Sequence, residues 1–154
     1  MEILIADDQA EKHRTIEEFL NESFQSCSID HSYSFKSTRD KIISKKYDIV
    51  LLDMTMPSFD SKQNVEVMSE VKKRALAGRD IVQTMNYRCI NSHVIIVTQF
   101  DVFGRHNQLT SIEEIATDLI HTYPNLVKGY VLWDYQGDSW KDALKKLIED
   151  SEID

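Results

Sequence analysis

Short apolar runs that each stop at an acid or a hydroxyl most constrain how this chain can fold. The clearest run spans residues 47–53 and ends at Asp53, and similar runs cover residues 3–6, 94–98 and 129–133. Residues 27–35 alternate apolar and polar side chains instead. Short, strongly apolar runs are typical of strands buried on both faces of a parallel sheet, whereas alternation indicates a strand with one wetter face.

Helical patterns separate these runs. In the first, Ile16, Phe19 and Leu20 fall on one face and charged residues, Lys12 among them, fall on the other. Further helices are expected over residues 37–46, 65–76 with a continuation or restart through 81–85, 110–121 and 138–148, and a loop over 99–109. Alternation of strands and helices predicts a flavodoxin-like (βα)5 fold, a doubly wound parallel α/β sheet with strand order 2-1-3-4-5.

Size and charge exclude several classes of function. The 154 residues suit a single domain, 1–154, and 26 acidic against 18 basic residues give a net charge of −8, which disfavours nucleic acid as a partner. No apolar run approaches the roughly 20 residues of a membrane helix. The first residues show no secretory signal, so we expect a cytoplasmic protein with Cys27 and Cys89 reduced.

In the expected strand order, the carboxyl ends of the first and third strands flank the switch point where such sheets bind ligands. Asp7 and Asp8 end the first run and Asp53 ends the third, so three carboxylates should meet there. Their mutual repulsion favours a hard divalent cation such as Mg²⁺. Thr98 ends the fourth run and places a hydroxyl beside them. Singly, each of these residues is more often a turn former than a ligand.

Three segments carry a resemblance to a known family. They are Ile5-Ala6-Asp7-Asp8-Gln9, the segment 51–57 in which Asp53 is followed by Met56-Pro57, and Val94 to Thr98. In this order, and at strand ends, they resemble the response regulator receiver domain of two-component signalling over almost the whole chain.

The resemblance implies that Asp53 accepts a phosphoryl group from a histidine kinase or a phosphotransfer protein in a phosphorelay. Mg²⁺ would be held by Asp7, Asp8, Asp53 and the backbone carbonyl of Thr55. Any enzymatic activity would be at most self-phosphorylation and dephosphorylation at Asp53.

The resemblance also implies a switch. Thr98 would bind the phosphoryl oxygen, and Tyr130 would change rotamer in response. The surface formed by helix 4, strand 5 and helix 5 would then meet a downstream effector protein or fused domain, or a second copy in a homodimer.

The chain departs from the family pattern at the end of its last strand. The family carries a lysine there that pairs with the phosphoryl group, and this sequence has Trp133. Lys128 lies five residues back, toward the strand's other end. Arg105 or Lys62, both expected on loops at the active face, are alternatives that the sequence does not decide between.

Other departures concern access and spacing. Gln99 stands where the family has a small residue, so it is expected to cover Asp53. Long intervals between the motifs predict insertions near residues 77–92 and 100–110. The second includes Phe100, Val102 and Phe103, either a partner surface or a loop folded back on the core.

Two alternative functions stay open. A pseudo-receiver would keep the fold as a phosphorylation-independent protein-interaction module, as Trp133 and Gln99 favour. An aspartyl phosphatase of the haloacid dehalogenase type needs an acid two residues after the nucleophile, where Thr55 stands. The sequence also has no glycine-rich phosphate loop.

Overall fold

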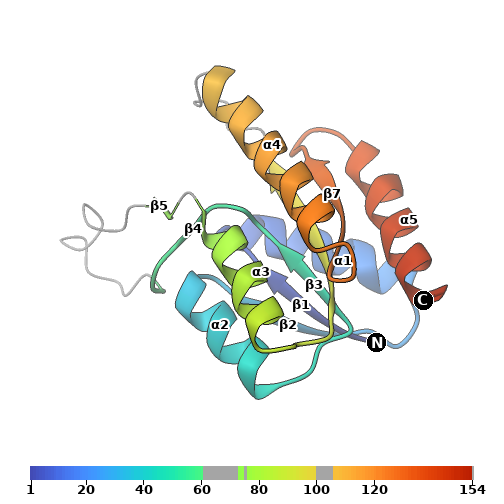
Figure 1. Ribbon diagram of the computed structural model, residues 1–154. Helices are drawn as coiled ribbons and strands as arrows, with labels where there is room; N and C mark the ends of the chain where they lie inside the picture. Colours follow the sequence, from blue (N-terminus) through green and yellow to red (C-terminus); the bar gives the residue numbers. More distant parts are fainter. Residues whose placement is uncertain (61–72, 75, 100–105, 154) are drawn as a thin grey trace.

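The fold is described here from a computed structural model, in residues 1–60, 73–74, 76–99 and 106–153. Its centre is a five-stranded parallel sheet in the order β2-β1-β3-β6-β7 (Figure 1). The doubly wound α/β fold predicted from the sequence is confirmed. The strand labels differ from the expected 2-1-3-4-5 because two further short strands intervene along the chain. The sheet comprises β1 (Glu2–Ala6), β2 (Ser28–Ser32), β3 (Ile49–Leu52), β6 (His93–Gln99) and β7 (Val127–Trp133).

The two additional strands follow directly after the end of β3. β4 (Met56–Pro57) pairs antiparallel with β5 (Lys73–Arg74) in a separate two-stranded sheet. The helix predicted over residues 65–76 is therefore wrong at 73–74, because pairing with β4 overrides the local helical periodicity there. The rest of that predicted helix lies almost entirely outside the described residues.

Helices cover both faces of the sheet (Figure 1). Alternate strand residues feed two buried clusters, one packed against α1 and α5 and the other against α2, α3 and α4. No helix in the described part of the chain is both long and apolar enough to cross a membrane. The helices are α1 (Ala10–Ser23), α2 (Phe35–Ser44), α3 (Ala77–Tyr87), α4 (His106–Thr122) and α5 (Ser139–Ile153).

The first predicted insertion, 77–92, coincides with α3. Residues 77–87 form this helix, with Ile81, Val82 and Met85 fully buried against the sheet. The sequence pattern was ambiguous because two adjacent segments both carry helical periodicity. The apolar side chains of α3 share one buried cluster with those of β3 and β6.

α2 begins earlier than predicted, because a capping box fixes its start. Ser34 accepts a hydrogen bond from the backbone N–H of Ser37, and the Ser37 side chain accepts one from the Ser34 N–H. β2 consequently ends at Ser32 rather than near residue 35. Ile42 is buried as expected, but Ile43, also predicted inward, is 42% exposed.

The connection from β6 to α4 differs from the predicted loop over residues 99–109. Gln99 still belongs to β6, and α4 starts at His106 rather than at Thr110. The second predicted insertion, 100–110, therefore overlaps α4. Its apolar residues Phe100, Val102 and Phe103 lie outside the described residues, as do the two alternative cations, Lys62 and Arg105.

Candidate functional site

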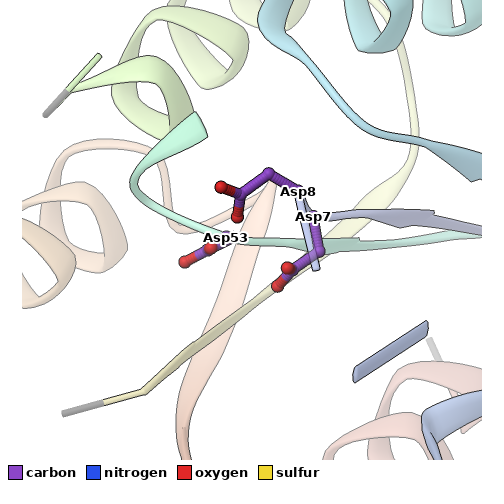
Figure 2. A group of neighbouring side chains, drawn as sticks. All are labelled: Asp7, Asp8 and Asp53. Carbon is purple, nitrogen blue, oxygen red and sulfur yellow. The ribbon is translucent and has the colours of Figure 1, made fainter. Parts of the chain in front are cut away.

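Three carboxylates meet at the carboxyl edge of the sheet. Asp7 and Asp8 follow β1, Asp53 follows β3, and the Asp53 backbone N–H donates to the Ala6 carbonyl across 2.9 Å. Each side chain offers a ligand oxygen within 4.8 Å of the other two. Figure 2 shows Asp7 and Asp8 leaving the chain in different directions, with the Asp53 carboxylate to the left of both. The convergence inferred from the sequence is therefore present.

The carboxyl group of Asp53 is buried, and its pKa is strongly shifted. Asp53 is 7% exposed, and burial, reinforced by Asp7 and Asp8, raises its pKa to about 7. The Lys12 ammonium and a hydrogen bond from the Thr55 backbone act in the opposite direction. A carboxylate in this state is poised to change charge near neutral pH, and a cation beside it would favour the ionised form.

Hydrogen bonds of the backbone fix the position of the segment that follows β1. The Asp7 N–H donates to the Ser32 carbonyl, and the Gln9 N–H donates to the Asp7 carboxylate across 2.9 Å. His13 is buried, which lowers its pKa, so the neutral ring donates from Nε2 to the Asp7 carbonyl across 2.7 Å. These bonds fix where the Asp7 and Asp8 side chains start.

Gly78 lets α3 approach the segment after β3. Its N–H donates to the Met54 carbonyl, and a Cβ at this position would lie 2.8 Å from the Asp53 carbonyl oxygen and 2.9 Å from the Met54 Cα. Both obstacles are backbone atoms, which cannot turn aside. Glycine is therefore required if α3 is to support the Asp53 segment at this distance.

Thr98 and Tyr130 lie on the α3–α4 face of the sheet. Thr98 is buried near the end of β6, and because Leu52 pairs with Ile96, it lies just past the level of Asp53. Tyr130, paired with Ile96, is 37% exposed. The Thr98 hydroxyl therefore lies beside the acids, whereas Tyr130 lies on β7, the strand next to that of Thr98.

Trp133 ends β7 on the opposite face of the sheet. It is 2% exposed and packs in the cluster beneath α1 and α5, with the Tyr135 ring 4.2 Å away. Lys128, near the start of β7, donates to the Pro124 carbonyl at the far end of the strand. The last strand therefore supplies no ammonium to the acids.

A cation nevertheless reaches them from α1. Lys12 is 1% exposed and forms an ion pair with Asp7. Its Nζ donates to the Val97 carbonyl across 2.9 Å and lies 4.0 Å from Asp53 Oδ2. Burial opposes the charge, but Asp53 and Asp7 outweigh it and raise the pKa of Lys12, so the ammonium is present at neutral pH.

Sequence reasoning missed Lys12 by assigning it to the polar face of its helix. The signal was available in the spacing. Lys12, Ile16 and Phe19 follow one another at i, i+4 and i+7, the positions of one helical stripe, and all three are buried. A charged residue on an apolar stripe, one turn past a pair of acids, indicates a buried ion pair.

The donor set fits a hard divalent cation. All three side-chain donors are carboxylates, the oxygen ligands that Mg²⁺ prefers. When all three are ionised, Lys12 leaves two negative charges, which a divalent ion would balance. Asp7, Asp8 and Asp53 are thus the residues that would hold it.

Comparison with known proteins places the chain in a family, although no protein-family model matches the sequence. The chain is 50% identical to the Detocs response regulatory protein DtcB of Enterobacter cloacae, over 97% of this chain and 99% of that protein. It is 28% identical to the uncharacterized protein y4jR of Sinorhizobium fredii, over 94% of this chain and 95% of y4jR.

Solved receiver domains share the fold. The signal receiver domain of a putative Luxo repressor from Vibrio parahaemolyticus matches with a TM-score of 0.65 and 15% identity, over 99% of this chain and 92% of that one. The response regulator TrrA of Thermotoga maritima, solved in complex with Mg²⁺ and BeF, matches with a TM-score of 0.59 and 20% identity, over 95% and 97%. With its acids at the ends of β1 and β3, this chain belongs to the response regulators of two-component signalling and has the receiver fold.

Proposed function

We propose that this receiver domain accepts a phosphoryl group on Asp53 from the phosphohistidine of a histidine kinase or a phosphotransfer protein. The convergence of Asp7, Asp8 and Asp53 within 4.8 Å is the observation that carries this proposal. Phosphoryl transfer depends mainly on positioning and charge neutralisation, which three converging carboxylates and a cation bound by them would supply. Mg²⁺, bound by these acids and the Thr55 carbonyl, would neutralise charge on the phosphoryl oxygens.

In this reaction one Asp53 carboxylate oxygen attacks phosphorus. An O–P bond forms as the P–N bond of the donor breaks, and the electron pair of that bond leaves on the imidazole, which is protonated by water. Thr98 donates its hydroxyl to a phosphoryl oxygen from the α4 face of the sheet. Thr55 anchors the attacking carboxylate by its backbone N–H.

The test is covalent labelling of the intact chain by acetyl phosphate, followed by protein mass. Wild type should gain one phosphoryl group only when Mg²⁺ is present, and Asp53→Asn should gain none. Asp48→Asn is the matched control, because Asp48 precedes β3 and Asp53 follows it. The Asp48 variant should be labelled as wild type is.

Two results would contradict the proposal. One is labelling of wild type that persists in Asp53→Asn, which would move the acceptor elsewhere. The other is a wild type that neither gains mass nor binds beryllofluoride with Mg²⁺.

For signalling, we propose that phosphorylation draws Thr98 toward Asp53 and allows Tyr130, half-exposed on β7, to change rotamer. The α4–β7–α5 surface would then meet an effector protein, a fused domain or a second copy of the chain, in the cytoplasm. Loss of partner binding in Tyr130→Ala with unchanged labelling would support this; equal binding would contradict it.

The burial of Trp133 and of Asp53 favours a second candidate, a pseudo-receiver whose interactions ignore phosphate. It predicts that Asp53→Asn binds the chain's partners as wild type does. A loss of binding in that variant would exclude this alternative.

A further inference from the structure

The buried ammonium of Lys12 points to a function beyond the ion pair with Asp7. An ammonium has three N–H donors. Two are used by the Asp7 carboxylate and the Val97 carbonyl. The third has no hydrogen-bonding acceptor among the described residues, and Asp53 Oδ2, at 4.0 Å, is close enough to attract it but too far to be bonded.

Lys12 supplies a positive charge beside Trp133, which supplies none at the end of β7. Trp133 fills the end of β7 with an uncharged ring, and Lys12 Nζ lies 5.7 Å from the centre of that ring. Both belong to the α1–α5 face of the sheet, whereas Thr98 lies on the other face. A group attached to Asp53 would have the ammonium on one side and the hydroxyl on the other.

Burying the Lys12 ammonium costs free energy, which disfavours a lysine without a function at this position. An ammonium removed from water must be compensated, and Asp7 alone would suffice for a structural pair. The position beside Asp53 brings positive charge to the carboxylate that would carry the negatively charged phosphoryl oxygens. A phosphoryl group on Asp53 would add oxygens where the third N–H lacks an acceptor.

We propose that Lys12, from α1, is the cation that contacts the phosphoryl group on Asp53, in place of a lysine at the end of the last strand. This inference rests on the proposed phosphoacceptor function. Lys12 keeps its proton throughout: it donates one N–H to a phosphoryl oxygen while the O–P bond forms and the P–N bond breaks. Trp133 at the end of β7 is compatible with phosphoryl transfer because Lys12, on α1, supplies the positive charge.

The first experiment compares labelling rates with acetyl phosphate and saturating Mg²⁺ in the intact chain. Lys12→Met should be labelled about tenfold to a hundredfold more slowly than wild type, the loss expected for one hydrogen bond to a charged group. Lys141→Met is the matched control, because Lys141 also lies 5.7 Å from a tryptophan ring, that of Trp140, outside the site. It should be labelled at the wild-type rate.

Magnesium affinity separates contact with the phosphoryl group from support of the site. Lys12 competes with a cation for Asp7, so Lys12→Met should bind Mg²⁺ without phosphate at least as tightly as wild type. Slower labelling with undiminished Mg²⁺ affinity supports the inference. A parallel loss of both would assign Lys12 a structural role and overturn it.

A measurement on wild type covers the case in which Lys12→Met does not fold. The ¹⁵N resonance of the Lys12 ammonium, assigned by its absence in Lys12→Arg, should shift when beryllofluoride binds with Mg²⁺. An unchanged resonance would overturn the inference while leaving the phosphoacceptor function standing. Absence of labelling in wild type would instead reject that function itself.

Discussion

Two lysines bind acids at opposite ends of β1, and they differ in burial. Lys45 reaches Glu2 at 3.0 Å and Asp30 at 2.9 Å, and its side chain is 41% exposed. Lys12, at the other end, contacts Asp7 and Asp53 with 1% exposure. Both clusters pair a lysine with acids, but the Lys45 cluster is exposed to water and the Lys12 cluster is buried in the protein.

The acids respond in opposite directions. Hydrogen bonds from Tyr47 and Lys45 lower the pKa of Asp30, whereas burial raises the pKa of Asp53 to about 7. Water screens the first cluster and makes it a minor contributor to stability. The second cluster crowds buried negative charge that a divalent cation can relieve, which is the property expected of a site.

The largest expected effect comes from removing each lysine in turn. Without Mg²⁺, Lys12→Met should lower the free energy of unfolding by about 3 kcal/mol, because it leaves buried acids without their cation. Lys45→Met should leave the urea midpoint nearly unchanged. Equal shifts for the two variants, measured by urea unfolding with a chelator, would erase the distinction between the clusters.

The next effect is a pH dependence that only the buried cluster produces. Folding raises the pKa of Asp53 from 3.8 to about 7, so the folded state binds its proton more tightly. Its contribution is fully present below pH 4 and is lost as the pH rises through about 7.

Urea midpoints of Mg²⁺-free wild type and Asp53→Asn, measured from pH 4 to 8, check this sign. The stability of wild type relative to the variant should fall as the pH rises. The difference in stability between wild type and Asp30→Asn should stay nearly constant over this range, because the lowered pKa of Asp30 places its titration below pH 4. A difference between wild type and Asp53→Asn that is independent of pH would refute the assigned pKa shift.

A smaller effect concerns the packing that supports Asp53. Gly78→Ala should destabilise the fold by about 1–3 kcal/mol and slow labelling, because the added methyl meets the Asp53 and Met54 backbone. Gly137→Ala is the control, since its methyl meets only the flexible side chain of Asp134. Equal stability in the two variants would show that α3 can shift without cost.

The sequence predicted best where a residue's neighbours follow from topology. Apolar runs located four strands of the sheet and an alternating segment located the fifth, and parallel strands that end at acids brought Asp7, Asp8 and Asp53 together. Those inferences needed only the strand order. The receiver resemblance then assigned the acids a chemistry.

The sequence predicted the structure least well where tertiary packing decides the outcome and the local pattern does not. Two adjacent segments carry helical periodicity, and the contact of Gly78 with the Asp53 segment, invisible in sequence, marks where α3 begins. Lys12 was overlooked because lysine is rarely buried without partners, and two of its partners, Asp53 and Val97, lie far along the chain. Its exposure depends on Asp53 and Val97, which only the fold places beside it.

The most direct test of the account is a crystal structure of the chain with Mg²⁺ and beryllofluoride. We expect beryllofluoride bonded to an Asp53 oxygen, Mg²⁺ between Asp53 and the acids after β1, and Lys12 Nζ within hydrogen-bonding distance of a fluorine. A structure with beryllofluoride absent from Asp53 would contradict the proposed function. One with beryllofluoride on Asp53 but Lys12 still bonded only to Asp7 and Val97 would contradict the role given to α1.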